Sequence, residues 1–231
     1  MQPSGRKRRD KVTIGGPRSP NQVMDQDLWR EGRAKIIEAA LPLFLRYGYH
    51  ATPVRVIAQA AGISSGSVFN YFSGKDEILE VILGDSQRQA EQSLDEAQTA
   101  LAASSEGSDP VEAFTRVYRR YAESIDAIRR YTLLAYQEAK SLAPKQRSPL
   151  FEREERIAAL LKKAAEGAIH AGFFGKDLMS LKVQSLIVLA HAWAVRHWAW
   201  GQYPSVKEYL DDLEKIAVAI MSEGAPRKSS P

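Results

Sequence analysis

Apolar residues recur every three or four positions along most of this chain, which is the spacing of one face of an α-helix. The clearest stripe runs through residues 28–49 and ends at Gly48, a residue suited to end a helix. Its apolar positions are Ile36, Ile37, Ala40, Leu41, Phe44 and Leu45. Pro42 lies inside the stripe and predicts a kink, because proline lacks the backbone N–H that a helix uses. No segment shows convincing strand alternation, so the pattern predicts an all-α protein.

Two short helices are predicted next, joined by a tight turn. Thr52 is a good N-cap before Pro53, and the apolar face that follows ends at Gly62. Ser64 is a second N-cap, opening a helix that runs through Tyr71. Two capped helices joined by a glycine-containing turn make a helix-turn-helix, whose second helix enters the major groove of DNA.

The rest of the chain predicts longer helices. One begins at Lys75 and another at Asp109-Pro110. Further helical patterns cover residues 131–140, 150–172, 177–201 and 205–221. The first helix and the helix-turn-helix therefore make a small N-terminal domain, and the longer helices make a larger C-terminal one.

Positive charge is concentrated at the N-terminus. Residues 1–24 hold six basic residues and one acidic residue, a net charge of +5, so the remaining residues sum to −1 within a total of +4. Their Gly, Pro and Ser content predicts a disordered arm, and residues 224–231 are expected to be a disordered tail. A flexible cationic arm either keeps a protein soluble or adds phosphate and minor-groove contacts to DNA.

Composition and motifs argue against several other classes of protein. The chain has no cysteine, which excludes disulfides and thiolate sites and fits a reducing cytoplasm. No apolar run approaches ~18 residues, so we expect no membrane span; burial is a better interpretation of the aromatic residues 198–203 than a membrane-surface belt. The chain has only four histidines and lacks the sequence motifs of hydrolases and nucleotide-binding proteins. We therefore expect no catalytic residue, no metal site and no cofactor.

Residues 36–79, IIEAALPLFLRYGYHATPVRVIAQAAGISSGSVFNYFSGKDEIL, resemble the N-terminal domain of the TetR family of bacterial transcriptional regulators. The resemblance rests on Phe44, the Gly48-Tyr49 pair, residues 57–62 and the SVFNYF block. It implies a DNA-binding domain over residues 25–75, with the helix-turn-helix at 53–72, and a ligand-binding and dimerisation domain over residues 76–223. The residues that it implies at or near double-stranded DNA are Thr52, Arg55, Ser64, Ser65, Ser67, Phe69, Asn70, Tyr71 and Lys75.

The chemistry of each side chain indicates which part of DNA it can contact. Hydroxyl and amide groups can bond phosphates, while Ser65 and Ser67 can reach base edges and Phe69 a thymine methyl. Tyr71 is either a DNA contact or a core residue. The family often has a basic residue where this chain has Ser65, and residues 25–80 hold six basic and seven acidic residues. We therefore hypothesise that the N-terminal arm supplies part of the electrostatic attraction to DNA.

The resemblance also implies a homodimer and a small-molecule effector for the C-terminal half. Helices 149–172 and 177–202 are apolar on most faces, so a seam with a second copy and an intramolecular core are the alternatives. The residues expected at the dimer interface are Ile157, Leu161, Val183, Leu186, Ala190, Trp193 and His197. Those expected around the ligand, with core packing as the alternative, are Phe114, Tyr118, Tyr121, Tyr131, Tyr136 and Trp193.

The ligand is expected to be largely apolar, either an aromatic compound or an acyl-CoA. Five arginines between residues 116 and 130 favour an anionic ligand, unless they form a solvated helix face. Together these features predict a cytoplasmic homodimeric repressor that binds a palindromic operator. Its ligand would release it by shifting the helix that starts at Lys75. An activator or an architectural DNA-binding protein is the alternative.

Overall fold

The computed structural model describes residues 20–102, 109–140, 144–199, 203 and 205–226. Within these ranges the secondary structure is helical and contains no strand, which confirms the all-α prediction. The helices are α1 (Pro20–Tyr47), α2 (Val54–Ala60), α3 (Ser65–Val68), α4 (Lys75–Ala102), α5 (Pro110–Ala127), α6 (Arg129–Glu138), α7 (Pro144–His170), α8 (Met179–Arg196), the 3₁₀ turn η1 (His197–Ala199) and α9 (Val206–Ser222).

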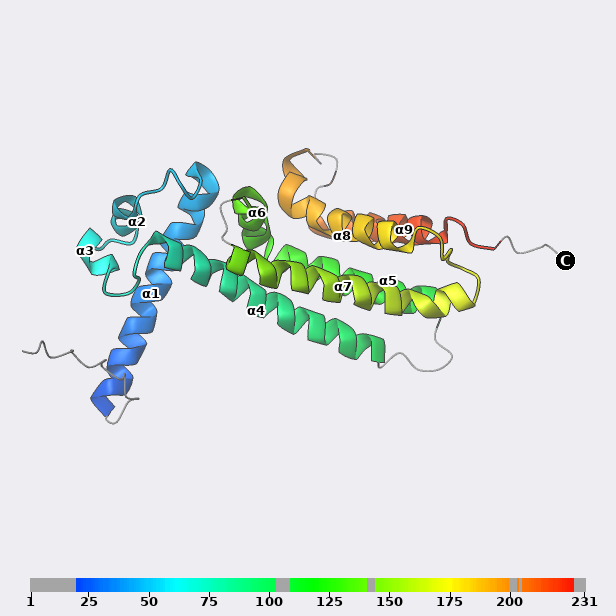
Figure 1. Ribbon diagram of the computed structural model, residues 1–231, viewed down its shortest axis with the longest axis horizontal. Coiled ribbons are helices and arrows are strands. Elements are labelled where there is room, and N and C mark those ends of the chain that lie inside the picture. Colours follow the sequence, from blue (N-terminus) through cyan, green and yellow to red (C-terminus); the bar gives the residue numbers. More distant parts are fainter. Residues whose placement is uncertain (1–19, 103–108, 141–143, 200–202, 204, 227–231) are drawn as a thin grey trace, which may run out of the picture.

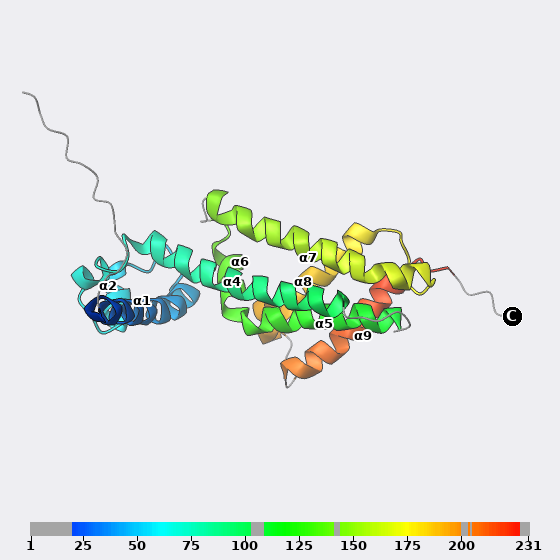
Figure 2. The ribbon, with the colours of Figure 1, turned by 90° about the horizontal axis from the view of Figure 1, so that it is seen from below.

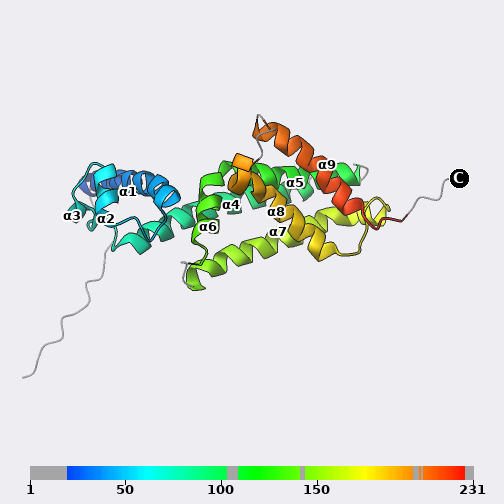
Figure 3. The ribbon, with the colours of Figure 1, turned by 90° about the horizontal axis from the view of Figure 1, so that it is seen from above.

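The helices form two parts joined by α4 (Figure 1). We call α1–α3 with the first two turns of α4 the headpiece, and the other helices with the rest of α4 the body. In the body α5 is central and packs against α4, α7, α8 and α9. Views from below and from above show the headpiece at one end of the molecule and α6 at the junction (Figures 2 and 3).

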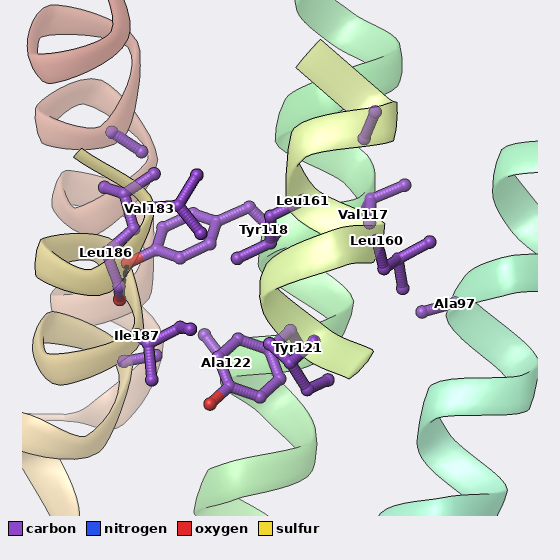
Figure 4. Packing of buried hydrophobic residues seen from close by; sticks show 14 of the residues in the cluster. Ala97, Val117, Tyr118, Tyr121, Ala122, Leu160, Leu161, Val183, Leu186 and Ile187 are labelled. Carbon is purple, nitrogen blue, oxygen red and sulfur yellow. Dashed lines mark hydrogen bonds between the residues drawn. The ribbon is translucent and has the colours of Figure 1, made fainter. Parts of the chain in front are cut away.

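Each part has its own apolar core. The headpiece core joins α1, α2, α3 and the start of α4, and it also contains Leu134 of α6, which is fully buried. The body core lies between α4, α5, α7, α8 and α9 (Figure 4). There the ring of Tyr118 on α5 is buried against α8, and its hydroxyl donates a hydrogen bond of 2.8 Å to the carbonyl of Leu186.

Several helix ends follow from local chemistry that the sequence reveals. Gly48 and Gly62 follow α1 and α2 with φ of 84° and 70°, a region that glycine enters without strain. Asp109 caps α5 by accepting a hydrogen bond of 2.9 Å from the N–H of Val111. Ser205 caps α9 in the same way, through the N–H of Glu208.

Two boundaries differ from the prediction. The helix α1 begins at Pro20, so residues 20–24 are helical and do not belong to the predicted disordered arm; residues 1–19 lie outside the described residues. The helix α7 begins at Pro144 and runs through Pro149, where an interruption was predicted. Proline fits the first helical turn, where the backbone N–H groups have no partner in the helix. Pro149 lies just past that turn and is exposed.

Candidate DNA-binding face and effector cavity

The helix-turn-helix is formed by α2, a four-residue turn and α3. The turn closes with a hydrogen bond of 3.0 Å from the N–H of Ile63 to the carbonyl of Ala58. Ser64 then caps α3 by accepting a hydrogen bond of 3.0 Å from the N–H of Ser67. The helix has only four residues, and hydrogen bonds to the carbonyl of Val68 carry the chain on through Phe72. Val68 and Phe72 are buried, so the opposite side of α3 faces outward.

The outward side of α3 carries small polar groups and one aromatic ring. Ser64, Ser65 and Asn70 are exposed, and 58% of Phe69 is accessible to solvent. Arg55 is exposed on α2. Five of the nine residues predicted near DNA are thus exposed at the surface. Ser67 is half-buried, and its hydroxyl lies 2.8 Å from that of Ser64.

Thr52 is located differently from the prediction. It is only 1% exposed, and its hydroxyl donates a hydrogen bond of 2.8 Å to the carbonyl of Gly48 at the end of α1. It therefore offers no group to a phosphate, contrary to our expectation. It does not cap α2 either, because the N-cap position is Pro53, which makes no side-chain cap.

Lys75 is also engaged within the fold. Its Nζ donates to the carbonyls of Tyr49 and His50, at 2.7 and 3.2 Å, and lies 4.3 Å from the centroid of the Tyr49 ring. Burial lowers the pKa of Lys75, and the charge of Glu138 partly offsets this effect. Two of the three ammonium hydrogens are therefore used to hold the loop after α1, and the role of Lys75 at DNA is at most partial.

Tyr71 packs against α1, which agrees with the alternative that it is a core residue. A Cβ atom on Gly32 would lie 2.5 Å from the Tyr71 ring, so a larger residue at position 32 would force this ring to move. Arg33 strengthens the same contact: it donates to the carbonyl of Tyr71 and pairs with Glu77 at 3.0 Å. Its guanidinium also lies 4.0 Å from the centroid of the Phe72 ring. These contacts fix α3 relative to α1.

One side of α6 reaches into the headpiece. Besides Leu134 in the headpiece core, Glu138 is 6% exposed, and its Oε1 accepts a hydrogen bond of 2.9 Å from the backbone N–H of Tyr49. Tyr49 begins the loop that leads into the helix-turn-helix, and its hydroxyl bonds Asp76 at the start of α4. Glu138 thus connects the body to both elements that orient α3.

The other side of α6 lines a cavity of about 150 Å³ between α6, α7 and α8. Its walls are mainly apolar, with a few polar groups from each helix. The lining residues are Thr132, Ala135, Tyr136, Ala139, Arg147, Leu150, Phe151, Arg153, Glu154 and His191. Of the residues predicted to line a ligand site, only Tyr136 is among them. The i, i+4 spacing of Thr132 and Tyr136 places both on one helix face, but nothing in the sequence marks that face as a cavity wall.

His191 is the central polar group of the cavity wall. It is 3% exposed, its Nε2 lies 2.8 Å from the hydroxyl of Tyr121, and its Nδ1 lies 2.9 Å from that of Tyr136. Burial, followed by the positive charge of Arg153, lowers the pKa of His191 to about 4. The imidazole is therefore neutral at physiological pH, with one nitrogen a donor and the other an acceptor.

The remaining aromatic residues predicted around the ligand have structural roles. Phe114 and Tyr118 are fully buried in the body core. Trp193 stacks on Tyr209 of α9 at 5.3 Å between ring centroids, away from the cavity lining. Tyr131 packs between the two cores. Core packing is thus the correct alternative for these four residues.

Most residues predicted at the dimer interface lie inside the core of a single chain. Ile157, Leu161, Val183, Leu186 and Ala190 are each at most 5% exposed. They belong to the cluster formed with α5, so their side chains do not reach a second copy. The prediction failed because α5 covers these faces of α7 and α8, and a sequence pattern cannot distinguish burial by a neighbouring helix from burial by a partner. Trp193 is half-buried and His197 is exposed.

The arginine-rich stretch of α5 forms a solvated face of ion pairs. Arg119 pairs with Asp211 at 2.6 Å and Glu214 at 3.2 Å, which ties α5 to α9. Arg116 and Arg120 also have carboxylate partners. The structure therefore favours the solvated-face alternative over an anionic-ligand site in this region.

A second hollow lies between α4 and α7. It measures about 750 Å³ and is an open groove whose walls include the exposed charged residues Arg156, Lys163 and Glu166. Arg156 already pairs with Glu91 of α4. The smaller cavity is the better candidate for an effector site, because its walls are largely apolar and two of its polar residues, Thr132 and His191, are buried.

No group of three or more His, Asp or Glu residues in the described part of the chain could hold a metal ion. Likewise, none of the described helices is long and apolar enough to cross a membrane.

Comparisons with known proteins agree with this geometry. A family model described as bacterial regulatory proteins, tetR family, matches residues 36–82. The HTH-type transcriptional regulator HbdR of Aromatoleum sp. (strain CIB) is 32% identical over 190 residues, which cover 82% of this chain and 80% of that protein. The HTH-type transcriptional repressor KstR2 of Rhodococcus jostii (strain RHA1) is 27% identical over 197 residues, which cover 83% and 90%.

A solved structure extends the likeness of fold to the body. AibR in complex with isovaleryl coenzyme A and operator DNA has a TM-score of 0.62 at 16% sequence identity, over 80% of this chain and 97% of that chain. Because the match spans 80% of this chain, the likeness of fold extends well beyond the headpiece.

Proposed function

Because the chain belongs to the TetR family and is a DNA-binding transcriptional regulator rather than an enzyme, we propose that it is a homodimeric repressor released from its operator by a small, largely apolar ligand. The observation that carries this proposal is the position of α6, with one side in the headpiece core and the other on the cavity. The repressor KstR2 is similar over most of the chain, which supports repression rather than activation.

The exposed side of α3 is the proposed reading surface. Ser65 and Asn70 offer hydrogen-bonding groups to base edges and phosphates, and Phe69 offers a ring to a thymine methyl. Arg55 on α2 adds a cation next to this surface. A four-residue helix reaches few base pairs, so two copies related by a two-fold axis are needed to read a palindromic operator.

The proposed dimer surface is the outer side of α8 and α9, which pack side by side on α5. Leu181 and Val188 on α8 are 63% and 59% exposed, and Ile216 on α9 is 45% exposed. Exposed apolar side chains on two neighbouring helices are costly in water and are typical of an interface. Their replacement by glutamate is expected to give a monomer in sedimentation analysis.

Ligand release is proposed to act through α6. A ligand that enters the cavity contacts Thr132 and Tyr136 on the side of α6 that faces away from the headpiece. Movement of α6 is then transmitted by Leu134 and Glu138 to the loop after α1 and to the start of α4. The ligand can shift this equilibrium only by its different affinities for the two arrangements.

Selection of random duplex DNA by the purified protein tests this function. We expect enrichment of a palindrome whose half-sites are about one helical turn apart or a multiple of it. Reporter expression from a promoter that carries the enriched site then gives the sign of regulation, and a fall on adding the protein supports repression. Folded protein that enriches no sequence would contradict the proposal and favour an architectural role.

A further inference from the structure

The cavity between α6, α7 and α8 contains two hydrogen-bond donors that the fold does not use, and this observation deepens the proposed function at the same site. The first is Thr132 on α6. It is 6% exposed, and its Oγ1 is buried without a hydrogen-bond partner among the described residues. A buried hydroxyl without a partner destabilises a fold. Its position on the cavity wall indicates that its partner is a ligand.

The second donor follows from the hydrogen bonds of His191. Burial raises the pKa of Tyr121, so its hydroxyl keeps its proton, and His191 Nε2 is its only partner in the described chain. The Tyr121 O–H must therefore donate to Nε2, because otherwise its proton would be buried without an acceptor. Nε2 is then unprotonated, and the single proton of the neutral imidazole lies on Nδ1.

That tautomer leaves the proton of Tyr136 free. Nδ1–H donates to the oxygen of Tyr136 at 2.9 Å, so this hydroxyl is an acceptor toward His191. Burial raises the pKa of Tyr136 as well, so its hydroxyl remains protonated and can donate to a ligand. Thr132 and Tyr136 are four residues apart and lie on the same side of α6. Two donors on one side of a cavity can supply the two hydrogen bonds that one carbonyl oxygen accepts.

Apolar side chains limit the body of the ligand. Ala135 of α6 and Ala139 directly after it leave space next to the donors, and Leu150 and Phe151 of α7 also line the cavity. A cavity of about 150 Å³ holds a group about the size of benzene. The group attached to the carbonyl is therefore a phenyl ring or a short branched alkyl chain.

Two arginines indicate the charge of the rest of the ligand. Arg147 and Arg153 line the cavity and are half-buried, and neither has an ion-pair partner among the described residues. Glu154 is the one carboxylate on the same wall, so the lining has an excess of one positive charge. Arginine binds carboxylate and phosphate groups through paired hydrogen bonds.

We propose that the effector is a small acyl or aroyl compound whose carbonyl oxygen accepts hydrogen bonds from Thr132 and Tyr136, and whose anionic part lies at Arg147 and Arg153. A free carboxylate and a coenzyme A thioester share this chemistry. In the first the anion is the carboxylate itself, and in the second it is the phosphate-bearing remainder outside the cavity.

Calorimetry on the full-length protein with five probes tests the proposal. Benzoate, benzoyl-CoA and isovaleryl-CoA carry both the carbonyl and the anion, benzamide carries the carbonyl alone, and toluene carries neither. We expect toluene to bind worst and at least one anionic carbonyl probe to bind about tenfold more tightly than benzamide. Tighter binding of benzoate identifies the free acid as the source, and tighter binding of a thioester identifies the coenzyme A compound. Toluene binding as well as benzamide would overturn the role of the carbonyl.

The variant T132V isolates the first donor, because valine has nearly the shape of threonine without its hydroxyl. We expect about tenfold weaker binding of the best carbonyl probe, unchanged binding of toluene, and a melting temperature no lower than that of the parent. T99V on α4, where the hydroxyl already bonds Asp95, is the matched control and should leave binding unchanged. Equal loss for toluene and the carbonyl probe would show a change of shape and contradict the proposal.

The double variant R147Q/R153Q isolates the anion site and should weaken the anionic probe while leaving benzamide unaffected. Operator binding by the ligand-free protein is measured in parallel. Normal operator binding with no response to any probe would overturn the ligand class and leave the repressor function standing. Absence of operator binding from the folded parent protein would refute the proposed function itself.

Discussion

His191 links the cavity to the stability of the protein through its protonation. The folded chain keeps this imidazole neutral, because burial and the charge of Arg153 lower its pKa to about 4. The unfolded chain protonates it below the ordinary value of 6.5. Between these values the unfolded state binds the additional proton, so the stability that this group contributes is complete above pH 6.5 and is lost as the pH falls toward 4.

The pH dependence of unfolding measures this effect. We expect the free energy of unfolding, from urea titrations, to fall by about 3 kcal/mol through His191 between pH 7 and pH 4. His191→Gln keeps one donor and one acceptor but does not titrate in this range, so its stability should fall less over the same interval. Parallel curves for the two proteins would mean that His191 is protonated equally in both states.

Lys182 stabilises the end of the body through backbone carbonyls. It is 6% exposed on α8, and its Nζ donates to the carbonyls of Gly175 and Met221 at 3.1 and 3.3 Å and to that of Glu223. These groups lie in the turn before α8 and at the end of α9, where helix carbonyls lack partners in their own helix.

Removing this ammonium leaves the carbonyls without their donor. Lys182→Met is therefore expected to lower the free energy of unfolding by about 2 kcal/mol in urea titrations. Lys163→Met, at an exposed position on α7, is the control and should change stability by less than about 0.5 kcal/mol. Equal stability of the two variants would show that water replaces Lys182 at these carbonyls.

At the scale of elements, α6 has the most distinctive position. Its ten residues contribute to the headpiece core, to the cavity wall and, through Glu138, to the backbone of Tyr49. Coupling between two sites requires an element that both can bias. The helix α6 meets that requirement more directly than α4, which was the lever expected from the sequence.

Glu138→Ala tests this role of α6. Loss of the bond to Tyr49 is expected to reduce about fivefold the factor by which the bound probe weakens operator affinity, while probe affinity for the free protein changes less than twofold. Fluorescence anisotropy of labelled operator, with and without the probe, measures that factor. Gln137→Ala, at the exposed neighbouring position, should retain full coupling. A normal factor in Glu138→Ala would assign the coupling to α4.

The elements also show how far sequence reasoning extends. The caps of α3, α5 and α9 and the glycines after α1 and α2 depend on local chemistry, so these ends were predictable. Which face of a helix meets another helix is decided by packing between distant segments. For this reason Thr52 was expected at DNA, and Leu186 at a partner, although both are buried within one chain. Thr132 was missed because an orphaned hydroxyl is visible only in the folded structure.

For the whole molecule, charge is divided between the arm and the rest. Residues 25–80, which include the helix-turn-helix, hold six basic and seven acidic residues. Residues 1–24, in contrast, have a net charge of +5. Each phosphate neutralised by a protein cation adds about 0.9 to the slope of log affinity against log salt concentration. We therefore expect deletion of residues 1–19 to reduce this slope for operator binding by about 2 or more.

A charge-neutral arm separates the effect of charge from that of length. Replacing its six basic residues with glutamine should reduce the salt slope as much as the deletion does. An unchanged salt dependence of operator affinity in both variants would contradict the hypothesis that the arm contacts phosphates.

The burial of Leu134 in the headpiece core has a consequence for how such regulators diverge. A headpiece that is joined to the body of another regulator loses the Leu134 side chain. An apolar cavity then remains in its core, unless the new body supplies a residue of the same shape. Operator specificity and effector specificity are thus not independent modules in this chain. Recombination between relatives is expected to succeed only where the crossover keeps α6 with its own headpiece, so that the part of the protein that senses and the part that reads DNA are inherited together.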